Sequence, residues 1–237
     1  EYEIKKITSV LLQCYITDLL KNGNLITGKG LSENTVNGII TVIQSSLKAA
    51  YLSNNTNLYV ADKIKRPKSK EKRVTCFSIP EQKKIEQAVK SDKRAKMIGI
   101  IMCLYTGLRI GELLALTWND ICFANGTLSV EKTLHDGKDK RGRFCCRINE
   151  PKTMSSIRIV PLPKQIMPLL KEMKRKADGK YVISSKGRSV SVRVYQRNFS
   201  KLLERLKIPH KGFHSLRHTF ATRALECGMD VKTLSEI

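Results

Sequence analysis

Hydrophobic residues recur at helical spacing in two runs within the first sixty positions. The first run stops at Gly23, and its apolar positions are Ile7, Val10, Leu11, Cys14 and Leu19. Ser32 stands where the cap of a second helix belongs, ahead of an apolar face made by Val36, Ile39, Ile40, Ile43, Leu47 and Ala50. A polar, glycine-rich stretch at 22–30 separates the runs, and Ser53–Asn57 ends the second. The pattern predicts a small all-α unit.

The pattern of the remaining chain is also mainly helical. Ser78-Ile79-Pro80-Glu81 has the spacing of a capping box, so we expect a helix that continues to about Val89. A strongly apolar helix is predicted over Ala95–Tyr105, with a break at Thr106-Gly107 and a restart over Leu108–Leu116. Further helices are predicted at about 164–177, at 191–207, from His214 to Gly228, and from Asp230 onward.

Three short stretches alternate in polarity or are rich in β-branched residues, and we interpret them as strands: Thr127–Glu131, Phe144–Asn149 and Ser156–Val160. A basic, glycine-containing loop at Asp136–Arg143 separates the first two. The expected fold is therefore mainly α with a small three-stranded antiparallel sheet.

A basic segment, KIKRPKSKEKR at 63–73, interrupts these patterns, and seven of its eleven residues are Lys or Arg. We therefore divide the chain into a helical domain at 1–62, a linker at 63–77 and a mixed domain at 78–237. Such a segment is a solvated tether, a strap along a phosphate backbone, or both. The strap hypothesis predicts DNA contacts from Lys63, Lys65, Arg66, Lys68, Lys70, Lys72 and Arg73.

The net charge of the chain indicates which class of binding partner to expect. The 237 residues include 44 Lys and Arg against 21 Asp and Glu, a net charge of +23 that repels itself unless a polyanion is near. No apolar run approaches the roughly 20 residues of a membrane span, and no signal peptide is recognisable. Double-stranded DNA is therefore the expected partner, and no membrane partner is expected.

Cysteine usage argues against a zinc finger. The seven cysteines include no pair with C-x-x-C spacing. Cys14 and Cys103 lie in apolar helical patterns and are predicted to be reduced core thiols of a cytoplasmic protein.

Three places carry candidate chemistry. Arg109 follows a glycine break at the start of a helix, where it either forms a structural ion pair with Glu112 or helps to bind a phosphate. Lys152 lies in a predicted turn between two strands, where it is either solvated or directed toward a ligand. His214 and Arg217 are three residues apart, so they share one helix face.

Together these four side chains suit a reaction at phosphorus. Cationic donors stabilise the negative charge that develops on a pentavalent phosphorane, and they need no metal ion or other cofactor. A two-metal nuclease would need clustered carboxylates, and Glu112, Asp120 and Glu150 do not have a ligand-like spacing.

Three sequence motifs of this chain resemble those of a known protein family. YTGLRIGELLALTWNDI at 105–121, PKTMSSIRIVPLP at 151–163 and HSLRHTFATRAL at 214–225 are similar, in order and spacing, to the tyrosine recombinases, the integrases of phages and conjugative transposons. The resemblance implies a helical core-binding domain at 1–62 and a catalytic domain at 78–237, which form a C-shaped DNA clamp. It matches Arg109 and Arg217 to the two catalytic arginines, Lys152 to the hairpin lysine and His214 to the catalytic histidine.

The resemblance also implies a chemistry and an assembly. A tyrosine attacks a phosphodiester, leaves a 3′-phosphotyrosine and a free 5′-hydroxyl, and the strand is then rejoined to a new partner. Oligomers on DNA, dimers or tetramers, and a location on the bacterial nucleoid are expected. The family's nucleophile lies beyond His214, whereas the seven tyrosines of this chain all precede it. We therefore expect a C-terminally truncated catalytic domain and a fragment that does not cleave DNA.

Two alternatives remain open at this stage. Type IB topoisomerases share the catalytic set and the chemistry, but they relax supercoils without joining two sites. A non-enzymatic, sequence-specific DNA-binding protein would use the basic surface alone, which leaves Arg109, Lys152, His214 and Arg217 without a role.

Overall fold

The computed structural model describes residues 3–53, 61–69, 74–92, 95–149 and 157–236. The chain divides into two units, Glu1–Arg73 and Val74–Ile237, which are described separately. The elements of the first unit are η1 (Ile4–Lys6), α1 (Ser9–Asn22), α2 (Glu33–Leu52) and η2 (Ala61–Lys63). The helices of the second are α3 (Ile79–Lys90), η3 (Ala95–Met97), α4 (Ile98–Thr106), α5 (Ile110–Ala115), η4 (Trp118–Asp120), η6 (Lys164–Ile166), α6 (Met167–Arg175), α7 (Val192–Arg205), α8 (Ser215–Glu226) and α9 (Val231–Glu236).

The first unit is an α-hairpin with caps that the sequence specifies. The Ser32 hydroxyl accepts a hydrogen bond from the backbone N–H of Thr35, 3.3 Å away, as expected of a cap for α2. The predicted apolar face of α2 is confirmed, with Val36 and Ile40 fully buried. The predicted face of α1 is correct at Leu19 but wrong at Val10 and Cys14, because Leu12, Ile16 and Leu19 form its buried stripe.

The error on α1 has a simple cause. Val10 is 70% exposed and Cys14 is exposed as well, because apolar residues lie on two neighbouring sides of this helix and only one of them meets α2. The prediction that Cys14 is a core thiol is therefore wrong, whereas Cys103 on α4 is fully buried.

The described ends of the predicted linker pack on the two units. Ile64 is buried in the core of the first unit, and the carbonyl of Pro67 accepts a hydrogen bond from the Asn37 side chain of α2. Phe77, at the other end, is buried in the core of the second unit. Core contacts thus reach into the predicted linker from both sides, at Ile64 and at Phe77.

Helix α4 is the centre of the second unit. It is the apolar helix predicted before Gly107, and each of its residues except Tyr105 is buried. It packs against α3, α5 and α8, so α8 and the restart at α5 are held on the same core element. The predicted helices around it are confirmed, including the capping box in which Ser78 and Glu81 begin α3.

The strands pair differently from the prediction. They are β1 (Ile121–Cys122), β2 (Thr127–Val130), β3 (Thr133–Lys138), β4 (Phe144–Asn149), β5 (Arg158–Pro161), β6 (Ser184–Ser185) and β7 (Arg188–Ser189). A three-stranded antiparallel sheet exists, but its order is β1-β2-β5. Phe144–Asn149 instead pairs with β3, and β6 pairs with β7.

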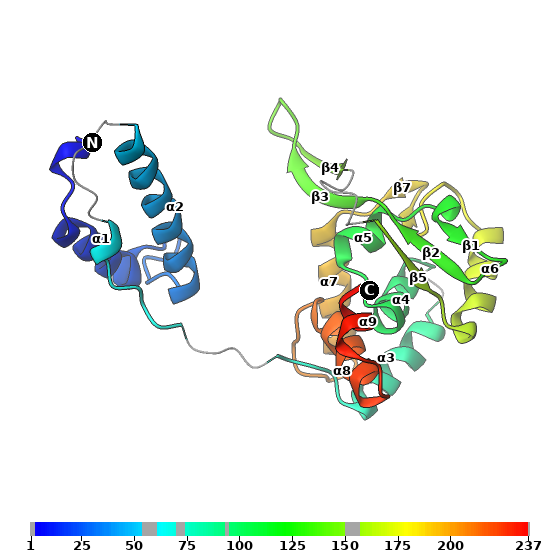
Figure 1. Ribbon diagram of the computed structural model, residues 1–237. Coiled ribbons are helices and arrows are strands. Elements are labelled where there is room, and N and C mark those ends of the chain that lie inside the picture. Colours follow the sequence, from blue (N-terminus) through cyan, green and yellow to red (C-terminus); the bar gives the residue numbers. More distant parts are fainter. Residues whose placement is uncertain (1–2, 54–60, 70–73, 93–94, 150–156, 237) are drawn as a thin grey trace. The chain divides into compact units, whose positions relative to one another are not determined.

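The hairpin of β3 and β4 projects from the body of the second unit, as Figure 1 shows. The residues predicted as the loop Asp136–Arg143 therefore lie partly in β3. Asp136 has a role at this position in β3. Its carboxylate accepts hydrogen bonds from the backbone N–H groups of Val192 and Arg193 at the start of α7. A residue type that is unfavourable in strands is used here to cap a helix.

Candidate active site

The turn between α4 and α5 presents Arg109. Gly107 has a φ of +66°, the left-handed conformation with which many helices end, and its N–H donates to the carbonyl of Cys103. The Thr106 hydroxyl donates to the carbonyl of Met102, 2.7 Å away, so the last turn of α4 is closed by a side chain as well. Arg109 lies two residues after Gly107, and its side chain is 59% exposed.

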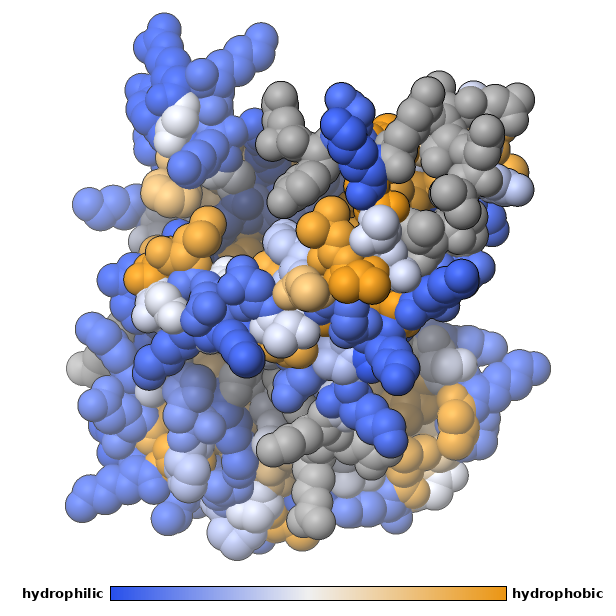
Figure 2. All heavy atoms as spheres, turned by 90° about the vertical axis from the view of Figure 1, so that its left-hand side faces the viewer, coloured by the Kyte–Doolittle hydropathy of each residue, from blue (hydrophilic) through white to orange (hydrophobic). Residues whose placement is uncertain are grey.

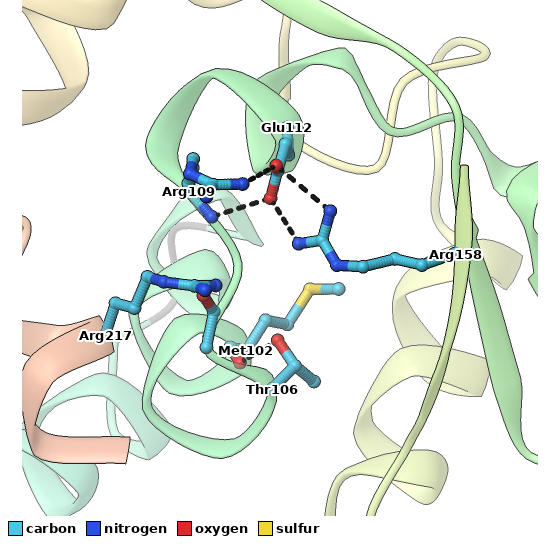
Figure 3. Close-up of polar contacts among 7 residues, drawn as sticks. Met102, Thr106, Arg109, Glu112, Arg158 and Arg217 are labelled. Atoms are coloured by element: carbon cyan, nitrogen blue, oxygen red, sulfur yellow. Dashed lines mark hydrogen bonds and ion pairs between the residues drawn. The ribbon is translucent and has the colours of Figure 1, made fainter. Parts of the chain in front are cut away.

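Glu112 connects Arg109 to the sheet. Its carboxylate accepts one hydrogen bond from the backbone N–H of Arg109 and one from Nη1 of the same residue, and each donor–acceptor distance is 2.9 Å. The same carboxylate accepts two more from Arg158 on β5, at 3.1 Å and 2.7 Å (Figure 3). These donors hold the pKa of Glu112 below its usual value although burial opposes that shift.

Arg217 reaches the same turn from α8. Its Nη1 atom donates to the carbonyl oxygen of Gly107, and the side chain is half-buried (Figure 3). Burial lowers the pKa of Arg217, and the charges of Arg109 and Arg158 lower it further. These interactions place Arg217 within electrostatic reach of both other arginines.

His214 lies one turn before Arg217, at the start of α8. Its ring packs edge-on against His218, with centroids 4.6 Å apart. Partial burial lowers the pKa of His214, and the neighbouring charges of His218, Arg217 and Arg109 lower it further. His214 is therefore neutral at pH 7, and a neutral imidazole has one nitrogen that accepts a proton.

The cluster keeps an excess of positive charge. Three guanidinium groups, those of Arg109, Arg158 and Arg217, surround the single carboxylate of Glu112. Among the described residues of this cluster, positive charges outnumber negative ones where Arg109 is open to solvent. Such an arrangement attracts an anion with several oxygens, such as a phosphodiester.

Three of these residues were predicted from the sequence, and a fourth, Arg158, was not. Arg109, His214 and Arg217 are brought together. The pairing of Arg109 with Glu112, the structural alternative, is also present, and it leaves the Arg109 side chain largely exposed. Arg158 was not expected, because the isoleucines on either side of it suggest that their face of the strand, and not that of Arg158, is buried.

Lys152 lies outside the described residues, as do Lys70, Lys72 and Arg73. The described strands on either side of Lys152 pair with other strands, β4 with β3 and β5 with β2. Among the basic residues of 63–69, the guanidinium of Arg66 donates to the side chains of Thr41 and Gln44 on α2. Lys63, Lys65 and Lys68 are exposed.

Two features are absent from the described residues. These residues contain no group of three or more His, Cys, Asp or Glu side chains that could hold a metal ion. Within the same ranges, none of the helices combines the length and the apolar character needed to cross a bilayer.

Comparison with known proteins gives consistent matches. The model of the phage integrase family matches residues 77–237. A XerC-like tyrosine recombinase of Caldanaerobacter subterraneus subsp. tengcongensis is 30% identical over 261 residues, which cover 99% of this chain and 64% of that protein. The chain thus spans less than two thirds of that relative's length.

Solved structures share the fold. The Tn1549 transposon integrase in complex with a circular intermediate DNA has a TM-score of 0.83 at 20% identity, over 98% of this chain and 77% of that one. A lambda integrase tetramer bound to a Holliday junction has a TM-score of 0.67 at 21% identity, over 98% of this chain and 63% of that one.

Proposed function

Because this chain belongs to the phage integrase family, the tyrosine recombinases, we propose that it is part of a site-specific DNA recombinase that integrates or excises a mobile element. The observation that carries the proposal is the meeting of Arg109, His214 and Arg217 around one exposed, positively charged turn. These residues come from two elements that are about a hundred positions apart in the sequence. A protein that only binds DNA has no need to collect them at one point.

The proposed reaction is strand exchange through a 3′-phosphotyrosine. The tyrosine oxygen attacks the scissile phosphorus and loses its proton, while the bond from phosphorus to the 5′-oxygen breaks and that oxygen gains a proton. Attack by the 5′-hydroxyl of a new partner strand reverses these bond changes. The energy of the phosphodiester is kept in the covalent intermediate, so no external energy source enters the balance.

The residues of the site divide this work. Arg109 and Arg217 hold the two non-bridging oxygens, whose negative charge grows in the transition state. His214 is neutral at pH 7 and accepts the proton of the tyrosine or donates to the phosphate. Lys152 supplies the proton to the leaving 5′-oxygen, which is the role expected from the family resemblance.

The nucleophile is proposed to be a tyrosine outside residues 1–237, so these residues alone do not cleave. Tyr195 is one tyrosine of this chain whose surroundings do not suit a nucleophile. Its side chain is 1% exposed, and its hydroxyl donates to the carbonyl of Lys96, 2.7 Å away. Burial also raises the pKa of Tyr195 well above its usual value.

Double-stranded DNA is the proposed substrate, and a homo-oligomer on that DNA the proposed assembly. Figure 2 shows hydrophilic residues over most of the face it draws, with hydrophobic residues scattered among them, and the chain has a net charge of +23. The lambda integrase relative was solved as a tetramer on a Holliday junction. We propose that the two units hold a duplex as a C-shaped clamp, with the exposed Lys63, Lys65 and Lys68 on its phosphates, and that the protein works at the bacterial nucleoid.

A suicide substrate tests the proposal. The protein encoded by the complete reading frame is mixed with a duplex nicked near the cleavage position, so that the short cleaved product diffuses away and the covalent complex accumulates. A recombinase becomes attached to the 3′-phosphate end and joins two sites in a paired assay. Relaxation of a plasmid without joining would indicate a topoisomerase, and tight binding without attachment would indicate a regulator.

A further inference from the structure

Arg158 is buried where the strand pattern places an apolar side chain. On β5, Ile159 is 70% exposed, whereas Val160 is 1% exposed. Side chains alternate along a strand, so Arg158 shares the inner face with Val160, and its side chain is 15% exposed. A strand that turns an isoleucine out and an arginine in breaks the usual pattern, and such exceptions concentrate at functional sites.

The partner of Arg158 explains the exception. Its Nη1 and Nη2 atoms donate one hydrogen bond to each oxygen of Glu112, at 3.1 Å and 2.7 Å. On its other side the same carboxylate accepts from Arg109 (Figure 3). Glu112 therefore lies between one covered arginine and one open arginine. We propose that Arg158 is a positioning residue, which fixes Glu112 so that Glu112 fixes the phosphate-binding guanidinium of Arg109.

Geometry favours this role over direct phosphate binding. Arg158 uses both outer nitrogens of its planar fork on Glu112, and its side chain is mostly covered. Arg109 uses one outer nitrogen, Nη1, for Glu112, and its side chain is 59% exposed, so a ligand can reach its guanidinium. An exposed arginine that is held in one orientation loses less conformational entropy when it binds a ligand.

Electrostatics adds a second effect of Arg158. Without it, Glu112 would neutralise Arg109, and the pair would offer an anion little net attraction. The charge of Arg158 compensates that of Glu112 from the buried side, and it also contributes to lowering the pKa of Arg217. The carboxylate thus orients Arg109 while the positive field at the open side is kept.

The inference rests on the proposed function, and its test separates the two. Arg158→Gln, Arg158→Lys and Lys211→Gln are made in the complete protein. Lys211 is the matched control, because its ion pair with Glu81 in the same unit is similarly covered, with side chains 17% and 21% exposed. Each variant is measured for single-turnover cleavage of the suicide substrate, for DNA affinity and for thermal unfolding.

A further readout does not depend on activity. Nitrogen NMR of the Arg109 guanidinium, assigned with Arg109→Lys, reports whether rotation about its Nε–Cζ bond is restricted. In Arg158→Gln we expect the single-turnover cleavage rate to fall about 10- to 100-fold, the usual effect of removing a residue that orients a group in direct contact with the ligand. DNA affinity stays unchanged, and the Arg109 signals become those of a freely rotating group. Lys211→Gln changes neither cleavage nor the Arg109 signals.

The conservative variant makes the result decisive. Lysine keeps the charge but cannot donate to both carboxylate oxygens from a planar fork, so Arg158→Lys is expected to fall between the wild type and Arg158→Gln in both readouts. Wild-type cleavage by Arg158→Gln, or unchanged restriction of Arg109, overturns the inference. If Arg158→Gln does not fold, the same two criteria apply to Arg158→Lys. A wild-type protein that never attaches to DNA refutes the proposed function, while the NMR result still decides on Arg158.

Discussion

The guanidinium of Arg217 donates a hydrogen bond to the main-chain oxygen of Gly107, two residues before Arg109. The bond joins α8, which carries His214 and Arg217, to the turn that carries Arg109. A backbone carbonyl moves only with the chain itself, so the two arginines are positioned by the fold and not merely by their own flexible side chains.

Replacing Arg217 by alanine in the complete protein should remove cleavage of the suicide substrate and leave DNA binding nearly intact. The loss in rate is expected to be about 100-fold or more, because a donor aimed at the developing charge is removed. Affinity depends on many phosphate contacts, of which this is one. Arg205→Ala is the control, since Arg205 is an exposed arginine of α7 that forms an ion pair with Asp92 at 3.9 Å. Equal losses of binding and cleavage in Arg217→Ala would show that it is only an anchor.

Gly107→Ala should lower the free energy of unfolding by about 1–3 kcal/mol, measured by denaturant titration. Gly107 has a φ of +66°, and a Cβ atom there would lie 2.5 Å from the Phe220 ring of α8. Both strain and a clash therefore oppose alanine. Gly212→Ala is the matched control, because its φ is not positive and a Cβ there has no heavy atom within 4 Å. Equal stability of the two variants would contradict the close packing of α8 on this turn.

Thr219→Val should destabilise the protein by about 1–3 kcal/mol, whereas Thr219→Ser should retain most of the stability. The Thr219 hydroxyl is buried, accepts from the N–H of Phe77 at 2.9 Å and donates to the carbonyl of Ser215 at 2.7 Å. Valine preserves the shape but leaves the Phe77 N–H unpaired. Thermal unfolding of the three proteins checks this, and a valine variant as stable as the serine variant would refute it.

His214 should titrate below pH 6.5, the ordinary imidazole value. As the pH falls below about 6.5, the unfolded chain takes up the proton before the folded chain does, so the free energy of unfolding decreases until the folded pKa is passed. NMR of the imidazole signals measures the midpoint. His218→Asn removes one neighbouring charge and should raise it, whereas His210→Asn should not, since His210 is hydrogen-bonded to Ser200 instead. A midpoint at or above 6.5 would contradict the effect of burial.

Binding to a duplex should depend steeply on salt. If the protein neutralises about 8 phosphates, the logarithm of the association constant falls with the logarithm of salt concentration at a slope near −7. Fluorescence anisotropy with a labelled duplex at several salt concentrations gives the slope. A slope near zero would be incompatible with the proposed clamp.

Elements with local signals were predictable from the sequence. The caps at Ser32 and Ser78 depend on residues three positions away, so the start of α2 and that of α3 were both located. Gly107 ended α4 for an equally local reason. In α8, spacing alone placed His214 and Arg217 one turn apart.

Strand pairing and the ion pairs between elements were not predictable in this way. Phe144–Asn149 was assigned to the wrong sheet because its partner, β3, contains Asp136 and Gly137, whose types disfavour strands. Arg158 was missed because its role depends on Glu112, 46 positions earlier, and because the isoleucines beside it suggest the opposite face. Such contacts are decided by tertiary packing, which no window of neighbouring residues contains.

The segment Thr75–Phe77 lies at the start of the second unit, and each of its three residues forms a hydrogen bond with α8. The Thr75 hydroxyl contacts Ser215, Cys76 contacts Thr222, and the carbonyl of Phe77 accepts from Arg223. The chain that enters the second unit is therefore attached to the helix that carries Arg217. A displacement of Thr75–Phe77 would be transmitted directly to that helix.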